Sequence, residues 1–292
     1  MYKDLVDYKY IMSKSKIYEG RIINASPKNI AVLDTGAYAH KELNGKIIDF
    51  KDLVNDKHSL YDDNGHGTHI SGIISAKKQG INLNCKQIVV KVLDKNGNGK
   101  VENVIKGIEY ILKRKDQLNI GIVNISMGAE AEQESEEEKM LLKYVESLWE
   151  KGLVVVCAGG NNGPKKQSIT VPGNSQKVIT VGACDDEVKS TAGRINYSGR
   201  GPLCNCVIKP DIVTVGSNIF NLSNKNNGYI IRSGTSMATA VTTAVIGTIM
   251  EKNNEHTPKI IKKMLLDSAL DMGKDVSVQG NGLLNIDKLY IF

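Results

Sequence analysis

The amino-acid sequence predicts an α/β fold, with a doubly wound, mostly parallel sheet and helices on both faces. Two observations predict it. Short runs that are apolar on both faces alternate along the chain with longer segments in which apolar residues recur every three or four positions. No Pro/Ser-rich linker, low-complexity tract or internal repeat interrupts this alternation. We therefore expect one domain over residues 1–292, with residues 1–28 as an N-terminal segment leading into it.

The elements follow in chain order. Five apolar runs predict buried strands, at residues 30–33, 88–93, 120–125, 153–157 and 178–181. Five segments with helical periodicity predict helices, at residues 66–77, 101–113, 136–150, 235–251 and 258–270. Because strands and helices alternate, neighbouring strands need crossover connections and the sheet is expected to be parallel.

Composition narrows the class of protein. A chain of 292 residues with 41% hydrophobic content can bury a large core. Its 38 basic and 32 acidic residues are spread along the chain, which predicts a mildly basic surface and no nucleic-acid interface. No apolar run approaches the roughly 18 residues that span a bilayer. The chain also begins without an export signal, so we expect a cytoplasmic location and no membrane partner. The oligomeric state is left open.

Two segments invite a metal assignment. Residues 94–99 resemble the start of a helix-loop-helix calcium loop, but the twelfth position is Ile105 where a bidentate Glu is needed. A Gly/Asn-rich turn is the better interpretation. Cys204 and Cys206 are separated by one residue, which is not the usual zinc spacing. Cys157 lies in an apolar run and is expected to be a small buried side chain. No metal and no cofactor is predicted.

Reactive groups in open α/β sheets gather at the carboxyl ends of strands. Asp34 directly follows the first apolar run, although an Asp at a strand end is common. His66 and His69 stand at the start of a predicted helix, three residues apart and without the Glu of the H-E-x-x-H zinc pattern. Gly65 and Gly67 flank His66 and allow close approach of backbone or substrate. This setting suits a general base.

Two further polar residues occupy helix and strand ends. Ser236 begins a very apolar helix, where unpaired amides and the helix dipole favour negative charge. The alternative is that it only caps that helix. Asn161 follows the apolar run at residues 153–157. It is either a turn former or a hydrogen-bond donor aimed at the oxyanion of acyl transfer.

In the order Asp, His, Asn, Ser, these four local sequences resemble the subtilisin family of serine proteases. The resemblance runs from about residue 29 to residue 287, with weaker matches at residues 126–128, 181–183, 199–202 and 209–211. It implies a serine endopeptidase in which Ser236 attacks the scissile carbonyl and His66 transfers the proton. Asp34 would then hold the imidazole, while Asn161 and the amide of Ser236 would bind the oxyanion.

The resemblance also implies an extended polypeptide substrate, bound as an added strand. Two segments would flank the substrate: one is Asn98, Gly99 and Lys100, and the other is Ser126, Met127 and Gly128. Residues 126–128 would also line the pocket for the side chain before the cut, together with Ala158, Gly159 and Gly160. Small residues there predict an open pocket for an apolar or long side chain.

Two departures suggest the intracellular kind of subtilisin. The segment between Ile74 and Val89 is too short for the calcium loop of many secreted members. The 33 residues before Asp34 are also few for their folding propeptide, so we expect a mature form or an enzyme that folds unaided.

Other functions remain open at this point. One is a catalytically inactive relative that presents a peptide groove, which the complete set of Asp34, His66 and Ser236 disfavours. Another is an enzyme dedicated to one partner peptide, in place of general proteolysis.

Overall fold

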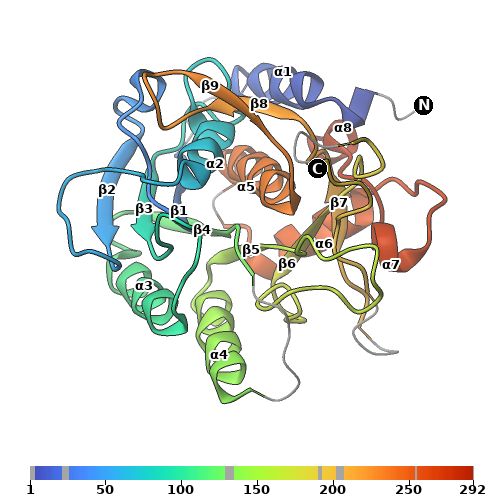
Figure 1. Ribbon diagram of the computed structural model, residues 1–292. Helices are drawn as coiled ribbons and strands as arrows, with labels where there is room; N and C mark the ends of the chain where they lie inside the picture. Colours follow the sequence, from blue (N-terminus) through green and yellow to red (C-terminus); the bar gives the residue numbers. More distant parts are fainter. Residues whose placement is uncertain are drawn as a thin grey trace.

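The central sheet contains seven strands in the order β2-β3-β1-β4-β5-β6-β7, and every pairing in it is parallel (Figure 1). The computed structural model describes residues 4–21, 26–128, 135–189, 193–201, 207–253 and 255–291. The strands are β1 Asn29–Asp34, β2 Ile47–Asp52, β3 Gln87–Lys91, β4 Ile120–Ile125, β5 Val154–Ala158, β6 Ile179–Ala183 and β7 Ile212–Thr214. The predicted parallel α/β sheet is confirmed.

Helices cover both faces of this sheet. The helices α2 (His66–Ser75) and α5 (Thr235–Lys252) pack against each other on one face, and α3 (Val101–Arg114) and α4 (Glu136–Glu150) on the other (Figure 1). Helix α5 is buried over nearly its whole length and contacts β4 to β7. Small and apolar side chains with buried threonines surround it on all sides, as expected of a helix that has no face in water.

The C-terminal part of the chain adds three helices. They are α6 (Pro258–Ser268), α7 (Val276–Gln279) and α8 (Ile286–Leu289). One continuous hydrophobic core reaches from Leu5 to Leu289, so both ends of the chain contribute to it. Among the described residues, no helix combines the length and the apolar character needed to cross a membrane.

The N-terminal segment contains a helix that the sequence patterns did not reveal. After a short 3-10 helix, Asp4–Val6, helix α1 (Tyr8–Glu19) packs against α5 and α8. Its buried positions are Ile11, Ser15 and Glu19, so two of the three are polar and the apolar periodicity is missing. The ring of Tyr18 stacks on Tyr290 with centroids 4.0 Å apart, which joins the two ends of the chain.

Four strands were also missed. Strand β2 is at the sheet edge and only its last residue is buried, and β7 has just three residues. Strands β8 (Ile219–Leu222) and β9 (Tyr229–Arg232) form a separate antiparallel hairpin that precedes α5. Edge and two-stranded elements carry exposed or mixed residues, so they lack the fully apolar signature of central parallel strands.

Candidate active site

Asp34 and His66 meet where β1 ends and α2 begins. Asp34 is completely buried, and its two carboxylate oxygens accept from His66 Nδ1 at 2.8 and 2.9 Å. The backbone amide of Thr35 also donates to Asp34 Oδ1, at 2.7 Å. Because the carboxylate can only accept, Nδ1 carries the imidazole hydrogen and Nε2 keeps its lone pair.

This approach of helix to strand depends on Gly67. A Cβ atom at Gly67 would lie 2.1 Å from the carbonyl oxygen of Gly36 and 3.1 Å from Asp34 Oδ1. The hydroxyl of Thr35 accepts from the Gly67 amide at 2.9 Å and so fastens the first turn of α2 to the strand end. The predicted role of the glycines, to allow close approach, therefore has a specific steric basis.

Asp62 holds the loop that leads into α2. Its carboxylate accepts from the hydroxyls of Thr35 and Thr68, at 2.9 and 2.6 Å. It also accepts from the backbone amides of Asn64, Gly65 and Thr68, at 2.8 to 3.0 Å. These five bonds occupy the acceptor sites of both oxygens. Asp62 is thus a structural carboxylate.

Lys91 is a fully buried cation at the end of β3, next to Asp34 at the end of β1. Its Nζ donates to the carbonyl oxygens of Thr35 and Leu93, at 2.7 and 2.8 Å, and to Asp63 Oδ1 at 2.8 Å. A buried charge is stable only when its donors are satisfied. Lys91 therefore fixes the exits of β1 and β3 relative to the loop before His66.

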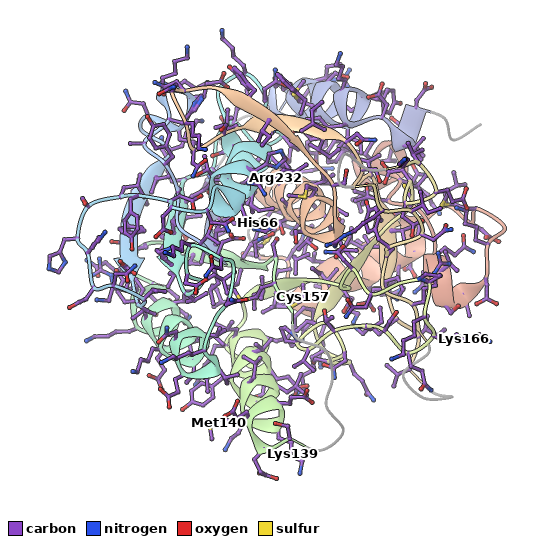
Figure 2. The ribbon with its side chains drawn as sticks, viewed as in Figure 1. His66, Lys139, Met140, Cys157, Lys166 and Arg232 are labelled. Atoms are coloured by element: carbon purple, nitrogen blue, oxygen red, sulfur yellow. The ribbon has the colours of Figure 1, made fainter. Side chains whose placement is uncertain are left out.

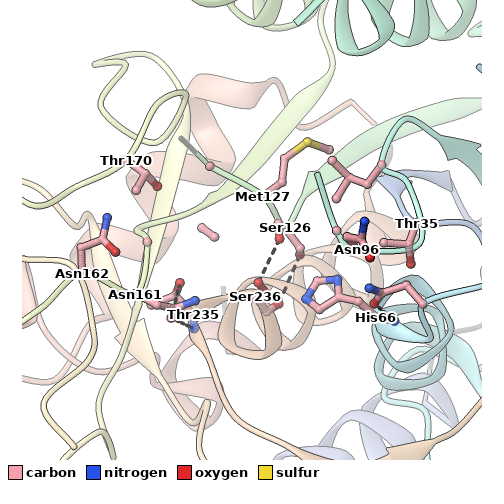
Figure 3. A pocket seen from close by; sticks show the side chains of 16 residues that line it. Thr35, His66, Asn96, Ser126, Met127, Asn161, Asn162, Thr170, Thr235 and Ser236 are labelled. Atoms are coloured by element: carbon pink, nitrogen blue, oxygen red, sulfur yellow. Dashed lines mark hydrogen bonds between the residues drawn. The ribbon is translucent and has the colours of Figure 1, made fainter. Parts of the chain in front are cut away.

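Ser236 occupies the second position of α5 and is 7% exposed. Figure 3 shows it between His66 and Asn161. Its hydroxyl donates to the carbonyl oxygen of Ser126 at 2.9 Å, and the Ser126 hydroxyl donates back to the carbonyl oxygen of Ser236 at 3.2 Å. Two reciprocal bonds thus join the start of α5 to the segment after β4.

A buried polar chain supports Ser126 from behind. Asn124 Nδ2 donates to the Ser126 hydroxyl at 2.8 Å, and the Thr243 hydroxyl donates to Asn124 Oδ1 at 2.9 Å. Asn124 and Thr243 are both fully buried. Sequence reasoning missed this chain, although Asn124 is the one polar side chain in the run Ile120–Ile125.

Asn161 is oriented by the N-terminus of α5. Its Oδ1 accepts from the backbone amide and the hydroxyl of Thr235, at 2.9 and 3.2 Å. With Oδ1 held in this way, Nδ2 is the remaining donor group of this side chain. The amide of Ser236 lies in the first turn of α5, where backbone N–H groups have no partner within the helix. Both donors border the same cavity.

That cavity has a volume of about 450 Å³ and is lined by His66, Asn161 and Ser236. Of the predicted substrate-binding residues, Ser126, Met127, Gly128, Ala158 and Gly160 also line it. Gly159 does not; its amide donates to the carbonyl oxygen of Val181 at 2.9 Å, and its predicted role stays a prediction.

The loop after β3 lines the cavity, but not with the residues that the sequence predicted. Leu93, Asn96 and Gly97 line the wall, whereas Asn98, Gly99 and Lys100 are exposed and do not line it. The reason is a tight turn: the amide of Asp94 donates to the carbonyl oxygen of Asn98, and Gly99 pairs back with Leu93. A role for Asn98, Gly99 and Lys100 beside an extended substrate stays a prediction.

Most of the chain is similar to proteins of one known family. The model of the subtilase family matches residues 28–283. The chain belongs to the subtilase family. It is 36% identical to serine protease AprX of Bacillus subtilis (strain 168), over 94% of this chain and 69% of that protein. It is 30% identical to an intracellular serine protease of Paenibacillus polymyxa, over 87% and 78% of the two chains.

A solved structure agrees with the sequence relatives. The crystal structure of a cold adapted subtilisin-like serine proteinase superposes with a TM-score of 0.71 and 27% identity, covering 88% of this chain and 86% of that one. This subtilase is accordingly a serine endopeptidase, as the sequence resemblance predicted. The alternative of an inactive groove protein is not favoured by these relatives.

No cluster of three or more His, Cys, Asp or Glu side chains that could hold a metal occurs among the described residues of this subtilase. Asp94 Oδ1 accepts from the amides of Asn96 and Asn98, at 2.8 and 2.9 Å, and so forms the turn expected for residues 94–99. Cys204 and Cys206 lie outside the described residues. Cys157 is fully buried, and burial raises the pKa of its thiol to about 12.

His69 has a different environment from His66. Its ring is buried and Nε2 donates to the carbonyl oxygen of Ile219 at 3.1 Å. Burial, with a smaller effect from the charge of Arg232, lowers the pKa of His69 to about 3. His69 is therefore a neutral packing residue on α2, and of the two histidines only His66 lines the cavity.

This burial has a consequence for acid stability. The unfolded chain binds a proton at His69 below about pH 6.5 and the folded chain does not, so stability is full above that pH. As the pH falls toward 3, His69 should lower the free energy of unfolding by about 1.4 kcal/mol per pH unit. We would measure urea unfolding in the Ser236→Ala background, which prevents self-digestion. There, His69→Gln should reduce the fall in the free energy of unfolding between pH 6.5 and 4.5 by about 2.5 kcal/mol. The exposed His58→Gln is the matched control, and equal pH slopes in all three proteins would contradict the assignment.

Proposed function

We propose that Asp34, His66 and Ser236 are the catalytic triad of this serine endopeptidase, and that Asn161 and the Ser236 amide form its oxyanion hole. The observation that carries the proposal is the short contact of His66 Nδ1 with both oxygens of the buried Asp34, on the rim of the cavity that also holds Ser236. This contact fixes the tautomer in which Nε2 is free to act as a base.

In the proposed mechanism, His66 Nε2 takes the hydroxyl proton as Ser236 Oγ attacks the scissile carbonyl carbon. The tetrahedral oxyanion is bound by Asn161 Nδ2 and the Ser236 amide, at the positive end of α5. The imidazolium then donates its proton to the leaving amine, the C–N bond breaks, and an acyl-enzyme remains. Water, deprotonated by His66, hydrolyses that ester and restores Ser236. Asp34 keeps the ring oriented and stabilises its charge throughout.

We further propose that the substrates are extended segments of unfolded polypeptides in the cytoplasm. Support comes from the intracellular relative of Paenibacillus polymyxa and from three cysteines, Cys85, Cys157 and Cys184, that are buried as free thiols. Residues 1–292 would act as a single peptidase domain. Cleavage of a proteome-derived peptide library tests the mode of action. Cuts at many unrelated sites indicate general proteolysis, and cuts at one motif indicate processing of a specific partner.

The oxyanion hole gives a direct test. Asn161→Ala should lower kcat by roughly 100- to 1,000-fold with little change in KM, because the lost donor acts only on the charge that develops in the transition state. Steady-state kinetics on a fluorogenic peptide measures both constants. The matched control is Asn162→Ala, which removes the same group from the next residue of the same turn and should cost less than tenfold in kcat. Similar losses in the two variants would refute the assignment of Asn161.

A further inference from the structure

A second cavity, of about 370 Å³, adjoins the first. It shares His66, Asn161 and Ser236 with it, and its remaining lining comes from β9 and the start of α5: Ile230, Ile231, Arg232, Ser233 and Met237. Ser236 therefore lies at the border of the two cavities. Cleavage at Ser236 divides a peptide into two halves, and the structure has one cavity for each half.

The chemistry decides which half enters which cavity. The first cavity contains Gly128, Ala158 and Gly160, the wall proposed for the acyl half. The second combines His66, which must protonate the leaving amine, with strand β9. The second cavity therefore receives the leaving half of the substrate. This assignment rests on the proposed function.

Among the described residues that line this second cavity, Arg232 is the one charged side chain apart from His66. It is labelled in Figure 2, is half-buried and lines the same cavity as His66. Its Nη2 makes a long bond of 3.4 Å to the carbonyl oxygen of Asn64. Its Nε is buried and has no hydrogen-bond partner among the described residues. No described carboxylate forms an ion pair with it, so its charge is not neutralised within this part of the chain.

The surroundings of Arg232 leave room for its planar head group. Gly65 has a φ of +97°, and a Cβ atom there would lie 3.2 Å from Arg232 Nη2 and 2.7 Å from Asn224 Oδ1. A larger residue at position 65 would therefore press on the guanidinium. The neighbours of Arg232 on the hairpin, Ile230 and Ile231, are 40% and 43% exposed and supply apolar surface beside the charge.

We propose that Arg232 binds a carboxylate on the leaving half of the substrate, and thereby sets cleavage specificity after the cut. A guanidinium with free donors is matched in shape and charge to a carboxylate, which accepts two parallel N–H bonds. The carboxylate has two possible sources: the side chain of Asp or Glu within the first two residues after the cut, or the terminal carboxylate of a short leaving fragment.

Matched internally quenched peptides test the proposal. One pair differs only by Glu against Gln at the second position after the cut, with an amidated tail of several residues. The other pair ends two residues after the cut, as a free acid against an amide. Wild-type kcat/KM should be at least about tenfold higher for the acid in one pair, since hydrogen bonds to charged groups are worth about one to two powers of ten. The pair that shows the preference identifies the source of the carboxylate.

Three variants locate the effect at Arg232. Arg232→Gln should bring the ratio of acid to amide close to one, and Arg232→Lys should keep only part of it because an ammonium lacks the planar fork. The exposed Lys225, on the same hairpin outside the cavity, provides the control: Lys225→Gln removes the same charge and should keep the wild-type ratio. Because each ratio is measured within one protein, a variant that is partly unfolded does not distort it.

The outcomes separate this proposal from the proposed function. Equal rates on acid and amide peptides in the wild type, or an unchanged ratio in Arg232→Gln, would overturn the role of Arg232 while leaving the protease assignment intact. A ratio that falls as far in Lys225→Gln would replace it by a general charge effect. Failure to cleave any peptide of the set, with no adduct formed at Ser236 by a fluorophosphonate, would overturn the proposed function itself.

Discussion

Replacing Ser236 with alanine is expected to lower turnover by about six orders of magnitude, because the substitution removes the hydroxyl that makes the nucleophilic attack. The variant should still hydrolyse peptides faster than the uncatalysed reaction in water, since the oxyanion donors and the substrate cavity remain. The substitution removes one buried hydroxyl bonded to Ser126, so the thermal midpoint should change by only a few degrees. Single-turnover kinetics on a peptide substrate gives the rate.

The control for that experiment is Ser13→Ala, at an exposed position of α1 remote from the cavity. It removes the same atom and should retain full turnover and full labelling of Ser236 by a fluorophosphonate. Turnover of Ser236→Ala within tenfold of the wild type would contradict the assignment of the nucleophile. Labelling in the wild type at another residue would do the same.

Asp34→Asn should lower turnover by about four orders of magnitude. The amide of an asparagine would donate toward His66 Nδ1, so the ring would carry its hydrogen on Nε2, where it cannot accept the proton of Ser236. Steady-state kinetics on a fluorogenic peptide measures the effect. Retention of more than about a tenth of wild-type turnover, equivalent to 1.4 kcal/mol of barrier, would show that Asp34 is not the triad acid.

Asp63→Asn is the matched control, because Asp63 is the aspartate nearest to His66 in the sequence. Its carboxylate pairs with the buried Lys91, whereas the described carboxylate that pairs with His66 is that of Asp34. This variant should be less stable, since Lys91 loses an anionic partner, but its turnover should stay within tenfold of the wild type. A loss as large as that of Asp34→Asn would mean that the loop held by Lys91, and not the carboxylate at residue 34, controls the rate.

The residues at strand and helix boundaries could be found in the sequence. Asp34 ends a buried strand, and His66 and Ser236 each open a helix, so local patterns place all three at one edge of a parallel sheet. The central strands were equally readable because they are apolar on both faces. Helix α1 was not, since Ser15 and Glu19 occupy two of its buried positions.

Residues that act through distant partners could not be predicted in the same way. Lys91 gains its role from Thr35 and Asp63, and neither contact leaves a mark in the sequence around Lys91. Arg232 ends an edge hairpin whose exposed residues look like ordinary surface. Asn124 did carry a signal, a polar residue in a central strand, but its meaning depends on Thr243 more than a hundred residues later.

The Ser236 hydroxyl donates to the carbonyl oxygen of Ser126, so it must turn before it can give its proton to His66. Such a bond has a net value of about 1 kcal/mol, so roughly one hydroxyl in six points elsewhere at any instant. Rotations of a side chain between staggered wells take about nanoseconds when the side chain borders solvent. Enzyme turnover takes about a millisecond or longer. The reorientation is therefore a rapid pre-equilibrium, and it lowers the observed rate by less than one power of ten.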